Sequence, residues 1–78
     1  MLLEIISPEE TVYKGEVVLV QMPGTMGSFE ILHNHAPLMA TLEDGEVKVI
    51  DHERNKFFIP IKGGVVKVKD NKIVLLTR

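Results

Sequence analysis

Three histidines, His33, His35 and His52, are the residues of this chain best suited to chemistry. Side chains two apart on an extended segment point the same way, so His33 and His35 would share a metal ion if His52 or a carboxylate completed the site. Zinc sites in proteins commonly show cysteines or a His-Glu-x-x-His helix, and this chain has no cysteine and no such motif. The pair is therefore interpreted as part of a polar loop, and no metal or other cofactor is predicted.

Other reactive groups also lack the setting that catalysis requires. Ser7 and Ser28 fall in turns, where a serine hydroxyl bonds the local backbone, and neither occupies a nucleophile elbow. The Gly24-x-x-Gly27 segment is followed by neither a helix nor Lys-Ser/Thr, so it is interpreted as a tight turn and not as a phosphate-binding loop. The sequence therefore predicts that the chain is not an enzyme on its own.

Length and composition restrict the class of protein further. A chain of 78 residues has room for one core, so residues 1–78 are predicted to form a single domain. The net charge of −2 argues against nucleic acid as a partner, because nucleic-acid binding depends on a basic face. No apolar run approaches the 18 or so residues of a membrane span, and the N-terminus lacks the basic region of a leader peptide, so neither is expected.

Charge is unevenly distributed along the chain. Residues 1–46 contain one lysine and eight acidic residues, whereas residues 47–78 contain eight basic and three acidic residues. We favour internal complementarity between the two halves, since charges of both signs normally intermingle on a small fold. The alternative is a basic patch offered to an acidic partner, made of Lys62, Lys67, Lys69, Lys72 and Arg78.

The composition and its periodicity predict an all-β protein. Ten valines and seven isoleucines stand against two alanines, and apolar residues alternate with a period of two. Strands are predicted at residues 2–6, 12–22, 29–32, 38–42, 46–49, 57–61, 66–69 and 72–77. Turns are predicted between them, including hairpin turns at Glu43-Asp44-Gly45 and Asp70-Asn71. Pro60 indicates an edge strand or a bulge, and Gly63-Gly64 is predicted to break the run.

Several predicted strands are apolar on both faces, which one open sheet cannot cover. In residues 12–22, for example, Val18, Val20 and Met22 are predicted to share one face, with Val17 and Leu19 on the other. The fold class is therefore all-β, a flattened antiparallel β-sandwich or barrel of seven or eight strands.

A methionine at a turn tip points to a partner. Met26 stands near the middle of the Gly24–Gly27 turn and has little reason to be buried in its own chain. Methionine is an adaptable contact residue, and exposed apolar patches mark sites where partners bind. We therefore expect part of the apolar surplus to form an interface.

Three segments of the chain resemble the N-terminal domain of the epsilon subunit of F-type ATP synthase. They are Gly24-Thr-Met-Gly27-Ser-Phe-Glu-Ile-Leu-His-Asn-His35-Ala-Pro-Leu38, then Leu42-x-x-Gly45-x-Val47, then Gly63-Gly64-Val65-x-x-Val68 with Asn71-x-Ile73-Val74-Leu75. The resemblance implies a flattened β-sandwich of about ten short strands, so the prediction from pattern and resemblance together is about 8–10. It also implies a non-catalytic part of the central stalk that couples ion-driven rotation to ATP synthesis.

The resemblance further implies partners, contact residues and location. The partners are the gamma subunit and the polar loops of the membrane-embedded c-ring, without insertion into the membrane. The complex would lie at the cytoplasmic side of the plasma (inner) membrane. Positions matching the family's gamma contacts are Ser7 and His35, and the turn matching its ring-contacting loop is Thr25, Met26, Gly27 and Ser28. Many members continue into two C-terminal helices that brake ATP hydrolysis; this chain stops at Arg78, so no brake is expected in it.

Two alternatives remain open at this stage. One is a small metal- or ligand-binding β-barrel protein that uses His33 and His35, with His52 in an enzymatic version, and it requires a deep pocket joining them. The other is a biotinyl or lipoyl carrier domain, which requires an exposed hairpin lysine flanked by Met or Asp. The predicted hairpin tips at residues 51–55 and 70–71 lack that lysine.

Overall fold

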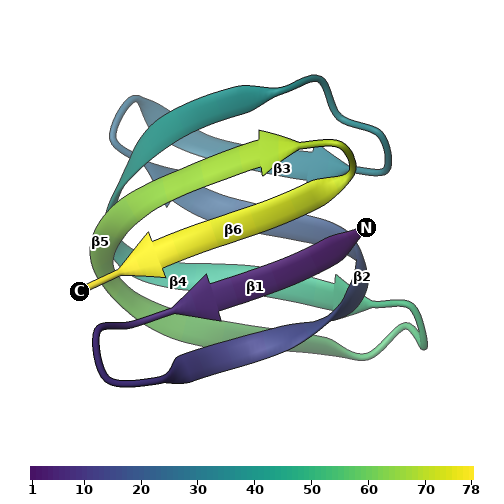
Figure 1. The fold of residues 1–78 in the computed structure, drawn as a ribbon, viewed down its shortest axis with the longest axis horizontal. Helices are drawn as coiled ribbons and strands as arrows, with labels where there is room; N and C mark the ends of the chain where they lie inside the picture. The colour runs from purple at the N-terminus through teal and green to yellow at the C-terminus, as the bar shows by residue number, and fades with distance from the viewer.

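The computed structural model describes residues 1–78 as six β-strands connected by short turns (Figure 1). It contains no helix that is long and apolar enough to cross a membrane. The strands are β1 (Leu2–Ile6), β2 (Thr11–Gly24), β3 (Gly27–Leu32), β4 (Leu38–Asp51), β5 (Lys56–Lys69) and β6 (Lys72–Thr77).

The sheet closes on itself, which confirms the predicted sandwich or barrel. The strand order is β1-β6-β5-β4-β2-β3, and the first half of β2 returns to pair with β1. β3 lies outside this ring, paired only with the second half of β2. The β1–β6 pair is parallel, a departure from the expected antiparallel arrangement, and every other pair is antiparallel.

The structure has six strands and not the expected 8–10, because β2, β4 and β5 are long, curved strands of 14 residues each. The hairpin predicted at Glu43-Asp44-Gly45 is wrong: β4 continues along β5, with Asp44 opposite Lys62 and Gly45 opposite Ile61. Figure 1 shows β5 curving around the left side of the molecule. The chain changes direction gradually here, so each long strand replaces two short ones.

The predicted break at Gly63-Gly64 is instead a bend inside β5. Both glycines have positive φ, 69° at Gly63 and 143° at Gly64, a backbone region that other residues rarely adopt. A Cβ on Gly64 would also overlap the backbone carbonyl oxygen of Leu76 on β6. Glycine therefore lets β5 bend while keeping its hydrogen bonds to β6.

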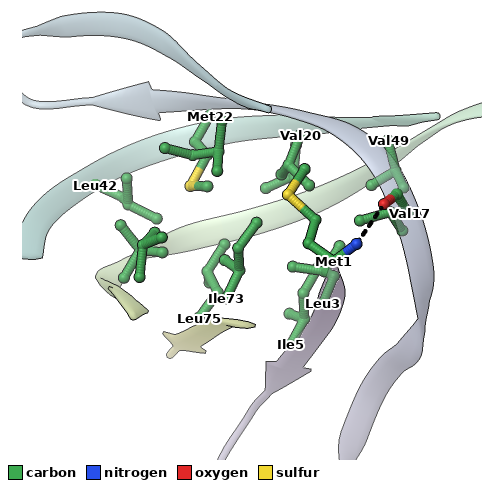
Figure 2. Packing of buried hydrophobic residues seen from close by; sticks show 14 of the residues in the cluster. Met1, Leu3, Ile5, Val17, Val20, Met22, Leu42, Val49, Ile73 and Leu75 are labelled. Carbon is green, nitrogen blue, oxygen red and sulfur yellow. Dashed lines mark hydrogen bonds between the residues drawn. The ribbon is translucent and has the colours of Figure 1, made fainter. Parts of the chain in front are cut away.

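The side chains of the interior are all apolar. No polar or charged side chain is buried, and no buried side-chain nitrogen or oxygen lacks a partner. Figure 2 shows side chains from both layers meeting in the centre, with the Met1 amino group bonded to the Val17 carbonyl at 3.1 Å. Fifteen residues form this core: Met1, Leu3, Ile5, Val17, Val20, Met22, Ile31, Leu42, Val47, Val49, Ile61, Val66, Val68, Ile73 and Leu75.

A β-bulge corrects the predicted faces of β2. Its pairing with β4 shifts between Val17 and Leu19, so the alternation slips by one residue. Val17 therefore joins Val20 and Met22 in the core, whereas Val18, which was predicted to share their face, is only half-buried. Strict alternation cannot anticipate a residue inserted into a ladder.

Two predicted turn features are confirmed. Asp70 and Asn71 have φ of 53° and 60° and connect β5 to β6, as a two-residue hairpin turn requires. Pro60 lies in a part of β5 that pairs only with β4, so it occupies an edge, where its missing N–H does no harm.

Internal charge complementarity does not take the form of ion pairs. The only ion pair joins the Met1 amino group to Glu16 at 3.4 Å, and no lysine or arginine lies within 4.0 Å of a carboxylate. The basic side chains are therefore free of ion pairs within the chain, as the alternative interpretation, a basic patch offered to an acidic partner, requires.

Candidate functional site

The β2–β3 turn presents an exposed side chain on an anchored backbone. The Thr25 N–H donates to the Thr41 carbonyl at 3.0 Å, and the two threonine hydroxyls lie 2.8 Å apart. Met26 is 98% exposed, as the sequence predicted, and Gly27 has a φ of 123°. The turn therefore holds an apolar side chain in solvent at a fixed place.

An apolar hollow of about 630 Å³ lies beside this turn. Five of its nine lining residues are hydrophobic and come from the turn, β3, β4 and β5, and no histidine takes part. The lining residues are Gly24, Thr25, Met26, Gly27, Phe29, Met39, Ala40, Thr41 and Val65. Its composition suits an apolar side chain of a partner better than a charged ligand.

The hollow borders a row of apolar residues on the outer side of the β1-β6-β5-β4 layer. Strand register aligns Ile6 with Leu76, Leu76 with Val65, and Val65 with Thr41. Val65 is 41% exposed and Leu76 is 52% exposed. In the next row, Met39 on β4 is 69% exposed. Met39 and the aligned residues together form what we call the outer apolar row, which contains four apolar side chains and one threonine: Ile6, Met39, Thr41, Val65 and Leu76.

Ser7 follows Ile6 directly after the end of β1, next to this row. Its hydroxyl closes the β1–β2 turn by donating to the Glu10 carbonyl and accepting from the Glu10 N–H, each at 3.2 Å. The residue before it, Ile6, belongs to the row that ends at Thr41, which bonds the β2–β3 turn. Ser7 therefore lies at the same end of the molecule as Thr25–Ser28.

His35 lies at the opposite end, in the β3–β4 loop. Its Nδ1 is 2.7 Å from the Ala36 carbonyl oxygen, and its N–H donates to the Leu32 carbonyl. β3 separates this loop from the β2–β3 turn by six residues, or roughly 20 Å at ~3.3 Å per residue. Figure 1 shows the two connections on opposite sides of the molecule. The structure does not bring Ser7 and His35 together.

The three histidines do not form a metal site. His33 and His35 share the β3–β4 loop, but His52 lies in the β4–β5 turn, with Nδ1 3.5 Å from the Glu16 carbonyl. No group of three or more histidine, aspartate or glutamate side chains is placed to hold an ion. The deep histidine-lined pocket that the ligand-binding alternative requires is not found.

Shifted pKa values occur away from the apolar hollow. At the β4–β5 turn, the N–H of Asn55, its side-chain amide and the N–H of Glu53 bond the Asp51 carboxylate, and these bonds lower its pKa. Partial burial, followed by the nearby Asp51 charge, raises the pKa of Tyr13, whose ring lies 5.4 Å from that of Phe57. Neither group faces the hollow, so neither indicates catalysis there.

The whole chain, residues 1–78, matches the family model described as ATP synthase, Delta/Epsilon chain, beta-sandwich domain. The chain belongs to this family. The resemblance found in the sequence is thereby confirmed.

Individual relatives agree with this membership of the Delta/Epsilon family. An ATP synthase epsilon chain of Leptospira borgpetersenii is 48% identical over 73 residues, covering 94% of this chain and 57% of its own length. One of Chlorobium limicola is 39% identical over 75 residues, covering 96% of this chain and 85% of its own length. The chain thus spans little more than half of the Leptospira relative.

A solved structure shares the fold of this Delta/Epsilon domain. A chain in the Euglena gracilis mitochondrial ATP synthase structure, described as OSCP/F1/c-ring, superposes with a TM-score of 0.92 at 23% identity. The match covers 99% of this chain and 49% of that one. At this identity the likeness supports the fold alone.

The outer apolar row was missed by the sequence analysis of this Delta/Epsilon domain. Met39 and Leu76 were predicted to lie in strands, but nothing in the local sequence marks them or Val65 as neighbours. Their alignment depends on which strands pair and in which register. Counting outward-facing apolar positions in the last two strands would have been the available signal.

Proposed function

We propose that the chain is a non-catalytic rotor domain in the central stalk of an F-type ATP synthase. It would link the gamma subunit to the c-ring and help couple ion-driven rotation to ATP synthesis. The match of its full length to the Delta/Epsilon beta-sandwich family carries this proposal. Relatives named ATP synthase epsilon chain, 48% and 39% identical, add support.

Rigidity is the property that this role requires. Rotation is transmitted only if the body between two partners resists deformation, and close-packed interiors transmit strain. The closed sheet and the wholly apolar core of this domain meet that requirement. Its surface of 4799 Å² also has room for two interfaces, since a standard contact buries about 800 Å² on each partner.

The partner contacts are assigned by position. Ser7 and His35 would contact gamma, and the turn formed by Thr25, Met26, Gly27 and Ser28 would rest on the c-ring loops. Because Ser7 and His35 lie at opposite ends, gamma would have to extend along the length of the domain, whose longest dimension is 27 Å. The domain itself would sit peripherally at the cytoplasmic side of the plasma membrane, outside the bilayer.

Single cysteines test these contacts, because the chain has none of its own. In assembled complexes, Met26→Cys should cross-link to a c-ring loop cysteine, whereas Ser7→Cys and His35→Cys should cross-link to gamma. Lys56→Cys, on an exposed residue next to the β4–β5 turn, serves as the control and should cross-link to neither. Joining of the His35→Cys variant to the ring, or of Met26→Cys to gamma alone, would reject the assignment.

A further inference from the structure

The β5–β6 hairpin carries three lysines on its outer face with no partner in the chain. Lys67 and Lys69 alternate outward on β5, and Lys72 lies directly opposite Lys69 on β6. They line a second hollow of about 320 Å³ with Asp70 and Val74. We call Lys67, Lys69, Lys72 and Val74 the lysine surface.

The placement of these lysines opposes stability. Like charges directly opposite on neighbouring strands destabilise a sheet, and the Lys69–Lys72 pair has this arrangement. No carboxylate lies within ion-pair distance of either one, although Asp70 stands in the turn between them. A fold that keeps such a pair without neutralising it leaves its charge available to another molecule.

The platform under the lysines is held firmly. Asn71 Oδ1 accepts a hydrogen bond from the Asn34 N–H at 2.9 Å, and Asn71 Nδ2 lies 3.4 Å from His33 Nδ1. The hairpin turn is thereby tied to the β3–β4 loop. A surface that is already ordered loses less entropy when it binds.

The chemistry of the lysine surface favours carboxylates over phosphates. Its hollow is lined by side chains, with no glycine and no helix N-terminus to supply the converging backbone N–H groups typical of phosphate sites. An apolar margin adjoins it, because Lys67 lies between Met39 and Val74 in one cross-strand row. Acidic residues interspersed with apolar ones would match both parts.

We propose that the lysine surface binds a carboxylate-rich segment of a protein partner. The surface lies apart from Ser7 and from the Thr25–Ser28 turn, whereas its hairpin is bonded to the β3–β4 loop that carries His35. The titration below uses the isolated chain, so its outcome is separate from that of the rotor assignment. The lysines of this surface belong to the basic half of the chain, residues 47–78, whose lysines and arginines form no ion pair within the chain.

The test is a titration of the isotope-labelled chain with a peptide of about ten alternating glutamates and leucines, followed by NMR. At about 50 mM salt, amide shifts should saturate, be largest at residues 67–74, and weaken as salt screens the charges. Replacing two lysines, Lys69→Gln with Lys72→Gln, should weaken affinity by about tenfold. The control pair, Lys56→Gln with Lys62→Gln, should change affinity by less than about twofold.

Two further titrations, with other anions in place of the peptide, test whether the surface prefers carboxylates. Pyrophosphate and vesicles containing phosphatidylglycerol should each bind more weakly than the peptide, and tighter binding of either would overturn the carboxylate assignment. No saturable shift, shifts centred elsewhere, or equal losses in the two variant pairs would overturn the site itself. The urea midpoint of the Lys69/Lys72 variant should equal or exceed that of the unmodified chain, so loss of folding cannot imitate loss of binding.

Discussion

Two methionines four residues apart in β2 and its turn have opposite environments. Met22 is 1% exposed and belongs to the core, whereas Met26 is 98% exposed. Met22→Ala should lower the free energy of unfolding by about 2–5 kcal/mol because it leaves a cavity. Met26→Ala should change it by less than about 0.5 kcal/mol. Urea denaturation of both variants measures the difference, and a comparable loss in the two would show that Met26 packs in the fold.

Asp51 is a single residue whose ionisation makes the free energy of unfolding depend on pH. Its pKa is lowered in the folded chain, chiefly by the Asn55 N–H, so the ionised form contributes stability above its ordinary pKa of about 3.9. That contribution is lost as the pH falls through the folded-state value. Asp51→Asn should therefore lower the urea midpoint at pH 7, and the gap from the unmodified chain should close below about pH 4.

The matched control for this pH effect is Asp44→Asn, since the Asp44 carboxylate accepts no hydrogen bond within the chain. This variant should show a much smaller gap at pH 7. If the difference in urea midpoint between Asp51→Asn and the unmodified chain stayed constant from pH 7 to pH 3, the variant would be destabilised for a reason other than the loss of the carboxylate charge.

Among the elements, β5 depends on a glycine for its bend. In Gly64→Ala the new methyl group would meet the Leu76 carbonyl, and the residue would keep a φ of 143°. We expect a loss of about 3 kcal/mol, from steric overlap and backbone strain together. In the control, Gly15→Ala, the methyl would meet only the end of the Tyr13 side chain, which can move, so the loss should stay below about 1 kcal/mol. Equal losses measured by urea denaturation would contradict the bend as the cause.

Local patterns predicted most elements, and tertiary pairing decided the rest. Alternation predicted strands at residues 46–49 and 72–77, and the structure has strands there, within β4 and as β6. Glu43-Asp44-Gly45 has the composition of a hairpin turn, yet β4 passes through it because both flanking segments pair with the same curved strand. The composition of a segment indicates whether it is compatible with a turn. It does not indicate whether the neighbouring strand bends in parallel with it, which would let the strand continue.

For the candidate site, the sequence predicted single residues better than surfaces. The exposure of Met26 follows from its place in a turn between glycines and is confirmed. The outer apolar row and the lysine surface each combine residues from two or more strands, so both require the strand register. The lysines were visible as a charge imbalance between the two halves of the chain, but the absence of ion pairs to them could be learned only from the structure.

For the whole molecule, closure of the sheet is the feature that matters to function. β1 pairs with both β6 and β2, so the chain's first strand completes the ring and no layer is free to open alone. Apolar and basic surfaces then occupy different parts of one stiff body. This arrangement suits a component that several neighbours hold at once.

The central claim is that this stiff body couples rotation to synthesis without performing a reaction. It is tested most directly by ATP synthesis in membrane vesicles from cells that lack the protein, with an imposed ion gradient and with the protein added back or withheld. We predict that synthesis driven by the gradient falls sharply without it and recovers when it is restored. Equal rates in its presence and absence would contradict the account.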